Sequence, residues 1–448
     1  MSLKRDRDDF VNGTREEEDG EERGGKRMKE SSSAILDEET LASGSRVVDE
    51  HHEHEYEERV LSYSLPSSSS SPSPSKRRPT PFQQPTQLTT FSYTPTRDLV
   101  FDNSALKYYV EPPRGAKLDY GYERWVRRGL EEEKGRLDSL LRALEKVREG
   151  EGEGKERVRG LGVVSWRGVL TKILTAPYGE ERDAWELNVM KVDETLYFEE
   201  FVSDAKAKEK QNMNPRQSMQ TYYGYAFESY CTADTPRRSN PDATQGTRVP
   251  FGWSGDVNNN VQWCSVVRTK LGNTRILIGG EVDCVREKYT GQPDTFVELK
   301  TSLTIRGAHD EARFEKKLLK FYFQSFLLGV PEIVVGFRTP GGVVSTVQTF
   351  RTVEIPRLVR GKPGAWDPVQ CLDWGNRFLE FVKESVEECH GSRARVWRVG
   401  FSPGEGVRVR ELNETEMAEV EAGEDRVGFL PGWYWRGLAA AWEERRTD

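Results

Sequence analysis

The sequence contains few cysteines. They are Cys231, Cys264, Cys284, Cys371 and Cys389. Five is an odd number, and none of them forms a CxxC pair, which argues against both a disulfide framework and a structural zinc site. We therefore expect a protein of a reducing compartment, the cytosol or the nucleus.

Histidine is scarce as well. Three of the five histidines, His51, His52 and His54, lie near the N-terminus, which leaves His309 and His390 in the rest of the chain. Neither of these two lies in the sequence context of a catalytic nucleophile. A Ser-His-Asp or Cys-His mechanism and a histidine-rich zinc site are therefore disfavoured.

Long apolar runs and a net positive charge are also absent. No apolar segment reaches the ~18 residues that a membrane span needs, and the first residues, MSLKRDRDDF, lack the apolar region of a secretory signal. We expect an intracellular protein with no membrane partner. The net charge of −8 disfavours nucleic acid at first sight, but the acidic runs EEEDGEE (16–22) and EHEYEE (53–58) account for much of it. The 66 Lys and Arg residues leave room for a local basic channel.

Composition divides the chain into two parts. Residues 1–90 are charged and then Ser/Pro-rich (SLPSSSSSPSPSKRRPTP), without a helical or strand period, which predicts a disordered tail. Its clusters KRMK (26–29) and KRR (76–78) are typical of nuclear import signals, so we expect the protein in the nucleus. Residues 91–441 are expected to form one globular domain, with an exposed loop at the Gly/Glu/Lys-rich stretch 148–160.

The domain is expected to be mixed α/β (α+β), with central β-sheets flanked by helices. Helical spacing and strand-like alternation support this interpretation. We expect helices at 136–147, 222–234 and 312–330 and strands at 261–269, 275–285, 295–302 and 332–339.

Two of these strands carry paired charges. Residues two apart on a strand share a face, so Glu281 and Asp283 point to one side, as do Glu298 and Lys300. If the two strands are neighbours, Asp283 and Glu298 lie close together, which is unfavourable without a bound cation. Hard oxygen ligands suit Mg²⁺ or Mn²⁺, and we expect two such ions.

Four residues take the remaining roles in the predicted site. Glu228 lies in an aromatic stretch, where an acid is costly unless it is paired or bound to metal, so it is the fourth expected ligand. The peptide carbonyl oxygen of Leu299 is the fifth expected metal ligand. Lys300 is expected beside the scissile phosphate, and Gln324 is expected to position water or phosphate.

A single EVD or ELK tripeptide is more often a solvated strand face with cross-strand ion pairs. The combination in this chain is acid-x-acid, a short turn, acid-x-Lys and a following helix. It matches the metal core of the restriction-endonuclease-like nucleases.

Longer motifs carry a closer resemblance. They are SWRGVLTKILTAPY (165–178), GYAFESYC (224–231), VNNNVQWCSVVRT (257–269), GEVDC (280–284), FVELKTS (296–302) and KLLKFYFQSFLLGVPEIVVGFR (317–338). Together they resemble the DXO family of decapping exoribonucleases, especially its fungal nuclear members, which bind the nuclear 5′–3′ exoribonuclease. The resemblance covers residues 91–355, in order.

This resemblance assigns roles to individual residues. It implies metal binding by Glu228, Glu281, Asp283, Glu298 and Leu299. It also implies catalysis or substrate contact at Trp166, Arg167, Gly168, Glu281, Lys300 and Gln324. For Arg167, a guanidinium that holds a 5′ phosphate, the alternative is a structural ion pair. Arg97, Glu132 and Cys264 are further expected substrate contacts, although a buried structural thiol is an equal alternative for Cys264.

The resemblance also implies an activity. The enzyme would remove incomplete or unmethylated guanosine caps, pyrophosphate from 5′-triphosphate RNA, and NAD caps, with possible 5′–3′ exonuclease activity. It would act in nuclear RNA quality control and stimulate its exoribonuclease partner. Two alternatives are a DNA nuclease with the same metal core and a non-catalytic adaptor that stabilises the exoribonuclease. The aromatic segment 428–444 is expected to be a helix packed on its own domain.

Overall fold

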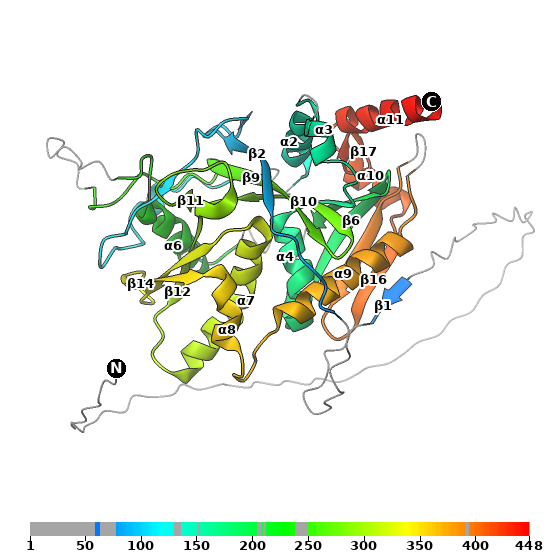
Figure 1. Cartoon of the computed structure of the whole chain (residues 1–448). Helices are drawn as coiled ribbons and strands as arrows, with labels where there is room; N and C mark the ends of the chain where they lie inside the picture. The colour runs from blue at the N-terminus through cyan, green and yellow to red at the C-terminus, as the bar shows by residue number, and fades with distance from the viewer. Residues whose placement is uncertain are drawn as a thin grey trace, which may run out of the picture. The chain divides into compact units, whose positions relative to one another are not determined.

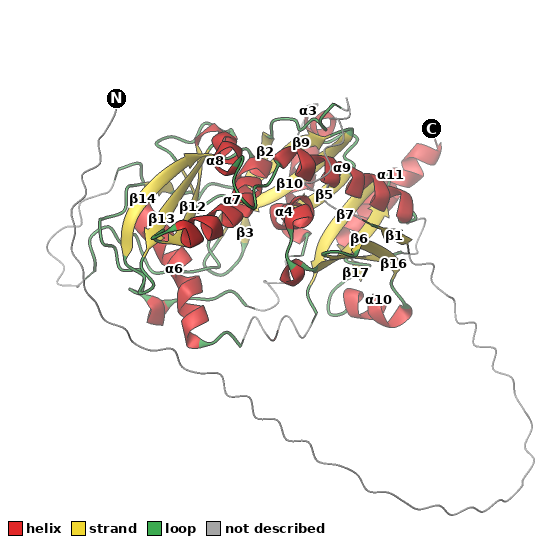
Figure 2. Cartoon of the chain, turned by 90° about the horizontal axis from the view of Figure 1, so that it is seen from below, coloured by secondary structure: helices red, strands yellow, loops and turns green. Residues whose placement is uncertain are grey.

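Two large β-sheets organise the protein, and helices pack against them (Figure 1; Figure 2). The computed structural model describes residues 59–62, 78–129, 136–150, 153–203, 208, 212–237, 249–389 and 394–447. These residues belong to one compact unit, Glu55–Asp448. The mixed α/β class predicted from the sequence is confirmed.

The larger sheet has ten strands. The pairs β10–β5 and β5–β7 are parallel and the others are antiparallel. Five successive residues of β10 are buried, because helices cover both faces of this part of the sheet. The order is β1 (Arg59–Leu61), β16 (Gly406–Glu411), β15 (Trp397–Ser402), β6 (Trp185–Val192), β7 (Thr195–Phe201), β5 (Val163–Trp166), β10 (Thr274–Glu281), β9 (Gln262–Leu271), β2 (Thr86–Tyr93), β3 (Leu99–Val100).

The smaller sheet has six strands. The pairs β11–β4 and β12–β13 are parallel. The order is β14 (Val344–Arg351), β13 (Glu332–Arg338), β12 (Phe296–Leu303), β11 (Cys284–Val285), β4 (Tyr108–Tyr109), β8 (Thr232–Ala233). A separate short pair joins β17 (Arg426–Val427) to β18 (Leu430–Pro431).

The helices form three groups, each with its own core cluster. One cluster joins α4 (Arg167–Thr175), α7 (Ala308–Leu328), α8 (Ile355–Val359) and α9 (Pro368–Ser385) to both sheets. A second packs α2 (Asp138–Arg148), α10 (Glu414–Glu421) and α11 (Gly432–Thr447) on the other face of the ten-stranded sheet. The third packs α6 (Pro215–Cys231) on the six-stranded sheet. None of the helices in the described ranges is long and apolar enough to cross a membrane.

The two helices that carry predicted site residues have clear sequence boundaries. Asn214 and Gln217 form a capping box at the start of α6, and Pro215 occupies its first turn. Helix α7 ends at Gly329, whose φ of 75° lies in the left-handed region that favours glycine. These signals place Glu228 in the last turn of α6 and Gln324 one turn before the end of α7.

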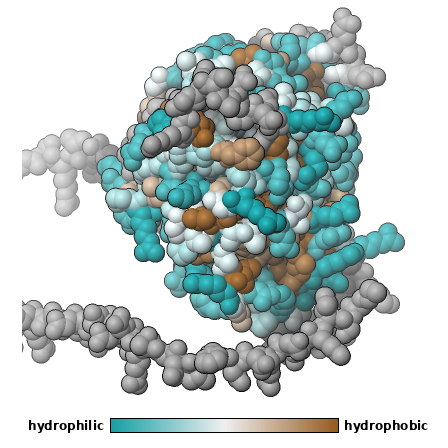
Figure 3. Space-filling model, turned by 90° about the vertical axis from the view of Figure 1, so that its left-hand side faces the viewer, coloured by the Kyte–Doolittle hydropathy of each residue, from teal (hydrophilic) through white to brown (hydrophobic). Residues whose placement is uncertain are grey.

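The described face on the α6 side of the molecule is largely hydrophilic, with small separate hydrophobic patches (Figure 3). The aromatic C-terminal segment packs on its own domain as predicted, because Tyr434 and Trp435 in α11 are 2% and 6% exposed.

The boundary predicted at residue 90 is wrong. Strand β2 begins at Thr86 and pairs with β9, and β1 pairs with β16, so parts of the predicted tail belong to the ten-stranded sheet. These strands form through pairing with distant partners, which local composition does not reveal. Of the rest of the predicted tail, including KRMK, nearly all lies outside the described residues. At the other end, α11 continues to Thr447, beyond the predicted limit at 441.

Two local predictions also need correction. The expected loop at 148–160 contains a short helix, α3 (Glu153–Arg157). The single strand expected at 275–285 is two strands, β10 and β11, which belong to different sheets. The chain passes from one sheet to the other at Val282 and Asp283.

Candidate active site

The acid-x-acid motif lies where the two sheets meet. Glu281 is the last residue of β10, and Cys284 is the first residue of β11. Strand β11 runs antiparallel to β12 with Cys284 opposite Val297. Continuing this register by one residue sets Asp283 across from Glu298, as the sequence predicted for neighbouring strands.

Glu298 is the most deeply buried of the four acids, at 1% exposure. Its two carboxylate oxygens accept hydrogen bonds from Arg167 Nη1 at 2.8 Å and from Lys300 Nζ at 2.5 Å. Burial alone would raise the pKa of this carboxyl group. The two cations outweigh burial and lower the pKa of Glu298 to about 2, so the group is ionised.

The other three acids are half-buried, and burial raises the pKa of each. Asp283 has a pKa of about 7, because burial and the neighbouring Glu298 disfavour its charge. The pKa of Glu228 is raised well above its usual value by burial, Asp283 and Glu281. For Glu281, Arg128 and Arg167 oppose the effect of burial only in part. These acids therefore lie close enough to perturb one another.

A cavity of about 260 Å³ is lined by Glu228, Glu281 and Asp283. A divalent cation there would offset the mutual repulsion of the carboxylates, and their oxygens are the ligand type that Mg²⁺ and Mn²⁺ prefer. The donor set therefore fits such an ion.

The acids are not arranged as a preformed ligand set. Among the described residues, no three His, Cys, Asp or Glu side chains are grouped so that they could hold a metal ion. Protein donors hold the carboxylates instead, since Asp283 Oδ2 accepts from the Leu299 N–H at 2.6 Å and Glu281 Oε2 accepts from Gln262 Nε2 at 2.5 Å. These hydrogen bonds use Oδ2 of Asp283 and Oε2 of Glu281, and an ionised carboxylate has a second oxygen that can ligate an ion.

Arg167 is the first residue of α4 and follows β5 directly. A Cβ atom on Gly280 would lie 3.0 Å from Arg167 Cβ, so the arginine packs against the strand end that carries Glu281. The sequence left two roles open for Arg167, a 5′-phosphate contact and a structural ion pair, and the structure contains an ion pair with Glu298. A guanidinium has five N–H donors, so this pair leaves others for a phosphate.

Trp166 and Gly168 flank Arg167. The Trp166 indole donates to the Arg136 carbonyl at 3.0 Å, which holds the ring in place. A Cβ on Gly168 would meet no atom within 4 Å, so the helix start is open at this point.

Gln324 is half-buried on α7. Leu328, one turn further on the same face, would lie 2.8 Å from a Cβ on Gly280. This face of α7 therefore packs beside the end of β10, next to Glu281.

The three further predicted contacts differ in position. Arg97 donates to Gln262 Oε1 at 2.7 Å, and Gln262 in turn contacts Glu281, so Arg97 is linked to the site through one amide. Cys264 pairs with Glu281 in the β9–β10 register but is 3% exposed within the core, which matches the alternative of a structural thiol. Glu132 lies outside the described residues.

Sequence reasoning missed Arg128 and Gln262. Arg128 lines the cavity and is the charged group that most strongly favours ionised Glu281. The adjacent pair Arg127-Arg128 was a visible signal of local positive charge. Its proximity to Glu281 depends on contacts between segments more than 150 positions apart, which the sequence does not show.

Comparison with known proteins identifies the family. Residues 83–435, more than half of the chain, match the family model described as RAI1 like PD-(D/E)XK nuclease. The chain belongs to this family. PD-(D/E)XK nucleases are hydrolases, and Asp283, Glu298 and Lys300 supply the acid and acid-x-Lys parts of the pattern that names them.

Relatives and solved structures agree with this assignment. Decapping nuclease RAI1 of Mycosarcoma maydis is 39% identical, over 78% of this chain and 86% of the relative. Decapping and exoribonuclease protein of Xenopus laevis is 36% identical, over 79% and 86%. The crystal structure of Scheffersomyces stipitis Rai1 in complex with (3′-NADP)⁺ and calcium ion has a TM-score of 0.65 and 28% identity, over 76% of this chain and 93% of that one. The resemblance drawn from the motifs is confirmed.

Proposed function

We propose that this nuclease is a metal-dependent hydrolase that removes caps from RNA 5′ ends. The observation that carries the proposal is the set of four acids at the junction of the two sheets, with Lys300 and Arg167 on Glu298. The names of the RAI1 and decapping relatives support an RNA 5′ end as substrate. The calcium ion and (3′-NADP)⁺ in the S. stipitis complex support a divalent cation and a nucleotide in this site.

Glu228, Glu281, Asp283, Glu298 and the Leu299 carbonyl would hold Mg²⁺ or Mn²⁺, two ions in our proposal. Bound ions would supply an activated water and stabilise the charge that develops on the phosphate oxygens. Without bound ions, burial raises the pKa values of Glu228, Glu281 and Asp283, so their charged forms are disfavoured. Bound cations would favour the charged forms.

The cationic and amide side chains have separate tasks. Lys300 Nζ, which lies 2.5 Å from Glu298, would neutralise negative charge on the scissile phosphate. Arg167 would use its remaining N–H donors to bind a 5′ phosphate. Gln324 would orient the phosphate or the attacking water from α7.

The proposed substrates share one chemistry. Incomplete guanosine caps, 5′-triphosphates and NAD caps are all joined to the first nucleotide through phosphodiester or anhydride bonds, which one centre can hydrolyse with different leaving groups. We further propose that the enzyme acts in the nucleus and stimulates a nuclear 5′–3′ exoribonuclease, which would digest the 5′-monophosphate RNA it produces. The KRMK and KRR clusters support nuclear import.

The test uses full-length protein with Mg²⁺ or Mn²⁺ on 5′-triphosphate, GpppN-capped and NAD-capped RNA, and on DNA of the same sequence. We expect product from the RNA substrates with the native protein and none with a Glu281→Ala, Asp283→Ala variant. Equal activity of the two proteins would refute the mechanism. If neither protein is active, the adaptor alternative is favoured, and cleavage of DNA alone would favour a DNA nuclease.

A further inference from the structure

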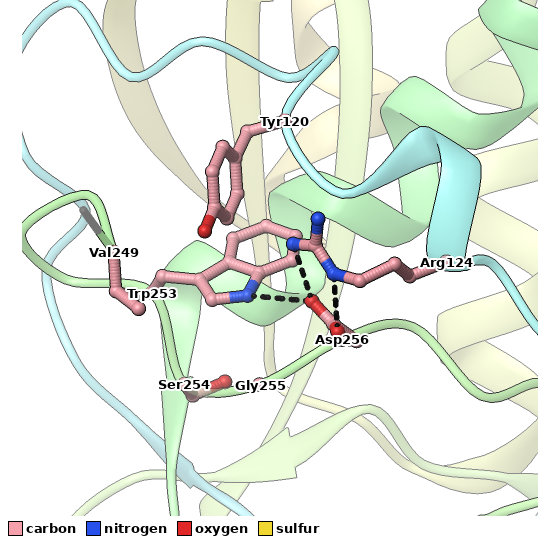
Figure 4. Close-up of a pocket in the computed structure, with 7 residues that line it drawn as sticks. All are labelled: Tyr120, Arg124, Val249, Trp253, Ser254, Gly255 and Asp256. Atoms are coloured by element: carbon pink, nitrogen blue, oxygen red, sulfur yellow. Dashed lines mark hydrogen bonds and ion pairs between the residues drawn. The ribbon is translucent and has the colours of Figure 1, made fainter. Parts of the chain in front are cut away.

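A second pocket adjoins the carboxylate cavity. It has a volume of about 610 Å³, within the range of small-molecule sites. Three of its lining residues, Ser254, Gly255 and Asp256, also line the carboxylate cavity, so the two spaces meet along this loop. The full lining is Tyr120, Arg124, Val249, Trp253, Ser254, Gly255 and Asp256 (Figure 4).

Aromatic rings form one wall of this pocket. The half-buried rings of Tyr120 and Trp253 have centroids 5.2 Å apart at an interplanar angle of 84°. Trp253 is supported from the core by Tyr230 at 5.0 Å, and its indole N–H donates to Asp256 at 3.3 Å. These contacts fix the indole before any ligand arrives, so ordering it on binding has little entropic cost.

The polar groups of the pocket neutralise each other. Arg124 donates to Asp256 through Nε at 2.6 Å and through Nη2 at 2.9 Å, as Figure 4 shows. This bidentate pair has no net charge and uses the Nε and Nη2 donors of the guanidinium, which favours an uncharged ligand over a phosphate. Arg124 also lies 5.0 Å from the centre of the Tyr120 ring. The wall therefore suits a flat, uncharged, aromatic group.

Gly255 lines both cavities and carries no side chain. A Cβ on Gly255 would meet no atom within 4 Å, so there is free space beside the loop at this point. A nucleotide chain with a phosphate at the carboxylates could place an attached base in the neighbouring pocket.

We propose that this pocket stacks a nucleobase of the RNA whose 5′ phosphates occupy the carboxylate cavity. This inference rests on the proposed function. Stacking on a tryptophan is tolerant of sequence, because every base has a π-face. The pocket would thus hold RNA in register without selecting its sequence.

The test measures binding apart from turnover. Full-length proteins that all carry Glu281→Gln are titrated by fluorescence anisotropy with 3′-labelled 5′-triphosphate RNA of about eight nucleotides, a length within known single-strand site sizes. We expect Trp253→Ala to weaken binding about 5- to 150-fold, the usual loss for one stacked base. Trp253→Phe keeps a stacking face and should retain most of the affinity. Phe251→Ala removes a 66%-exposed ring of the same loop that does not line the pocket, and should have little effect.

Substituted RNAs locate the base. RNAs that each lack one base are compared. For one position, loss of the base should lower the affinity of the parent protein and leave the affinity of the Trp253→Ala protein unchanged. Loss of affinity for both 5′-triphosphate and GpppN-capped RNA places a base of the RNA chain in the pocket, and loss for capped RNA alone places the cap guanine there. If Trp253→Ala unfolds, Tyr120→Leu provides the same comparison.

Two outcomes would overturn the inference. Equal affinity of the Trp253→Ala and parent proteins for every RNA would show that no base stacks there, as would an abasic penalty unchanged by the substitution. The native protein is assayed for RNA cleavage separately. If it cleaves RNA but Trp253→Ala does not change the binding affinity, only the stacking pocket is rejected. Failure of the native protein to cleave any RNA would instead reject the proposed function.

Discussion

Replacing Arg167 with methionine removes one of the two cations that hold Glu298. The arginine side chain is 14% exposed and the glutamate 1%, so solvent cannot replace the lost partner fully. Breaking a buried ion pair costs about 3–5 kcal/mol when a charge is left alone. Because Lys300 remains 2.5 Å from the other oxygen, we expect Arg167→Met to lower the free energy of unfolding by about 2–4 kcal/mol.

Urea unfolding, followed by tryptophan fluorescence without added metal, measures this loss. The matched control is Arg408→Met, which breaks a 3.2 Å pair with Glu405 in which both side chains are more than half exposed. That change should cost less than about 1 kcal/mol. If Arg167→Met unfolds at the same urea concentration as the control, the Arg167–Glu298 pair does not stabilise the fold and our reading of the site is wrong.

Two further predictions concern a buried acid outside the site, Glu199, and a packing contact behind Glu228. Burial raises the pKa of Glu199 to about 7 despite its 2.9 Å pair with Arg136, so the folded state keeps a proton that the unfolded chain has released. Relative to Glu199→Gln, native protein should therefore lose up to about 3 kcal/mol as the pH rises from 4.5 to above 7, and an identical difference at pH 5 and pH 8 in urea unfolding would contradict this. A Cβ at Gly336 would lie 2.4 Å from Phe227, the neighbour of Glu228 on α6. Gly336→Ala should cost about 1–3 kcal/mol of stability and reduce decapping, and unchanged unfolding with full activity would show that α6 adapts without strain.

The sequence predicted the fold class and the motifs more fully than the arrangement of the strands. The two-residue strand period predicted that Glu298 and Lys300 share a face, and both residues lie on β12. The same reasoning treated Glu281 and Asp283 as residues of one strand, whereas Asp283 lies between β10 and β11. It did not show that β10 and β11 belong to different sheets, because strand pairing is set by distant segments. The motif was therefore recognised, but its position at the junction of the two sheets was not.

The charged surroundings of the site were harder to predict. Arg128 perturbs Glu281 because a segment distant in the sequence reaches the site, whereas Gln262 contacts Glu281 from the neighbouring strand β9. Residues 86–90, the first part of the strand Thr86–Tyr93, were assigned to the disordered tail because the charged and Ser/Pro-rich sequence up to that point shows no sustained strand period. Pairing with β9 supplies the stability that local composition did not indicate.

We propose that the four acids bind divalent cations. Mn²⁺ binding to full-length protein, measured by electron paramagnetic resonance, tests it without a substrate. The site variant is Glu281→Ala, Asp283→Ala, and the control removes two exposed acids elsewhere, Glu405 and Glu424, by substitution with alanine. We predict that native and control proteins bind Mn²⁺ and that the site variant does not. Equal Mn²⁺ binding by all three proteins would contradict it.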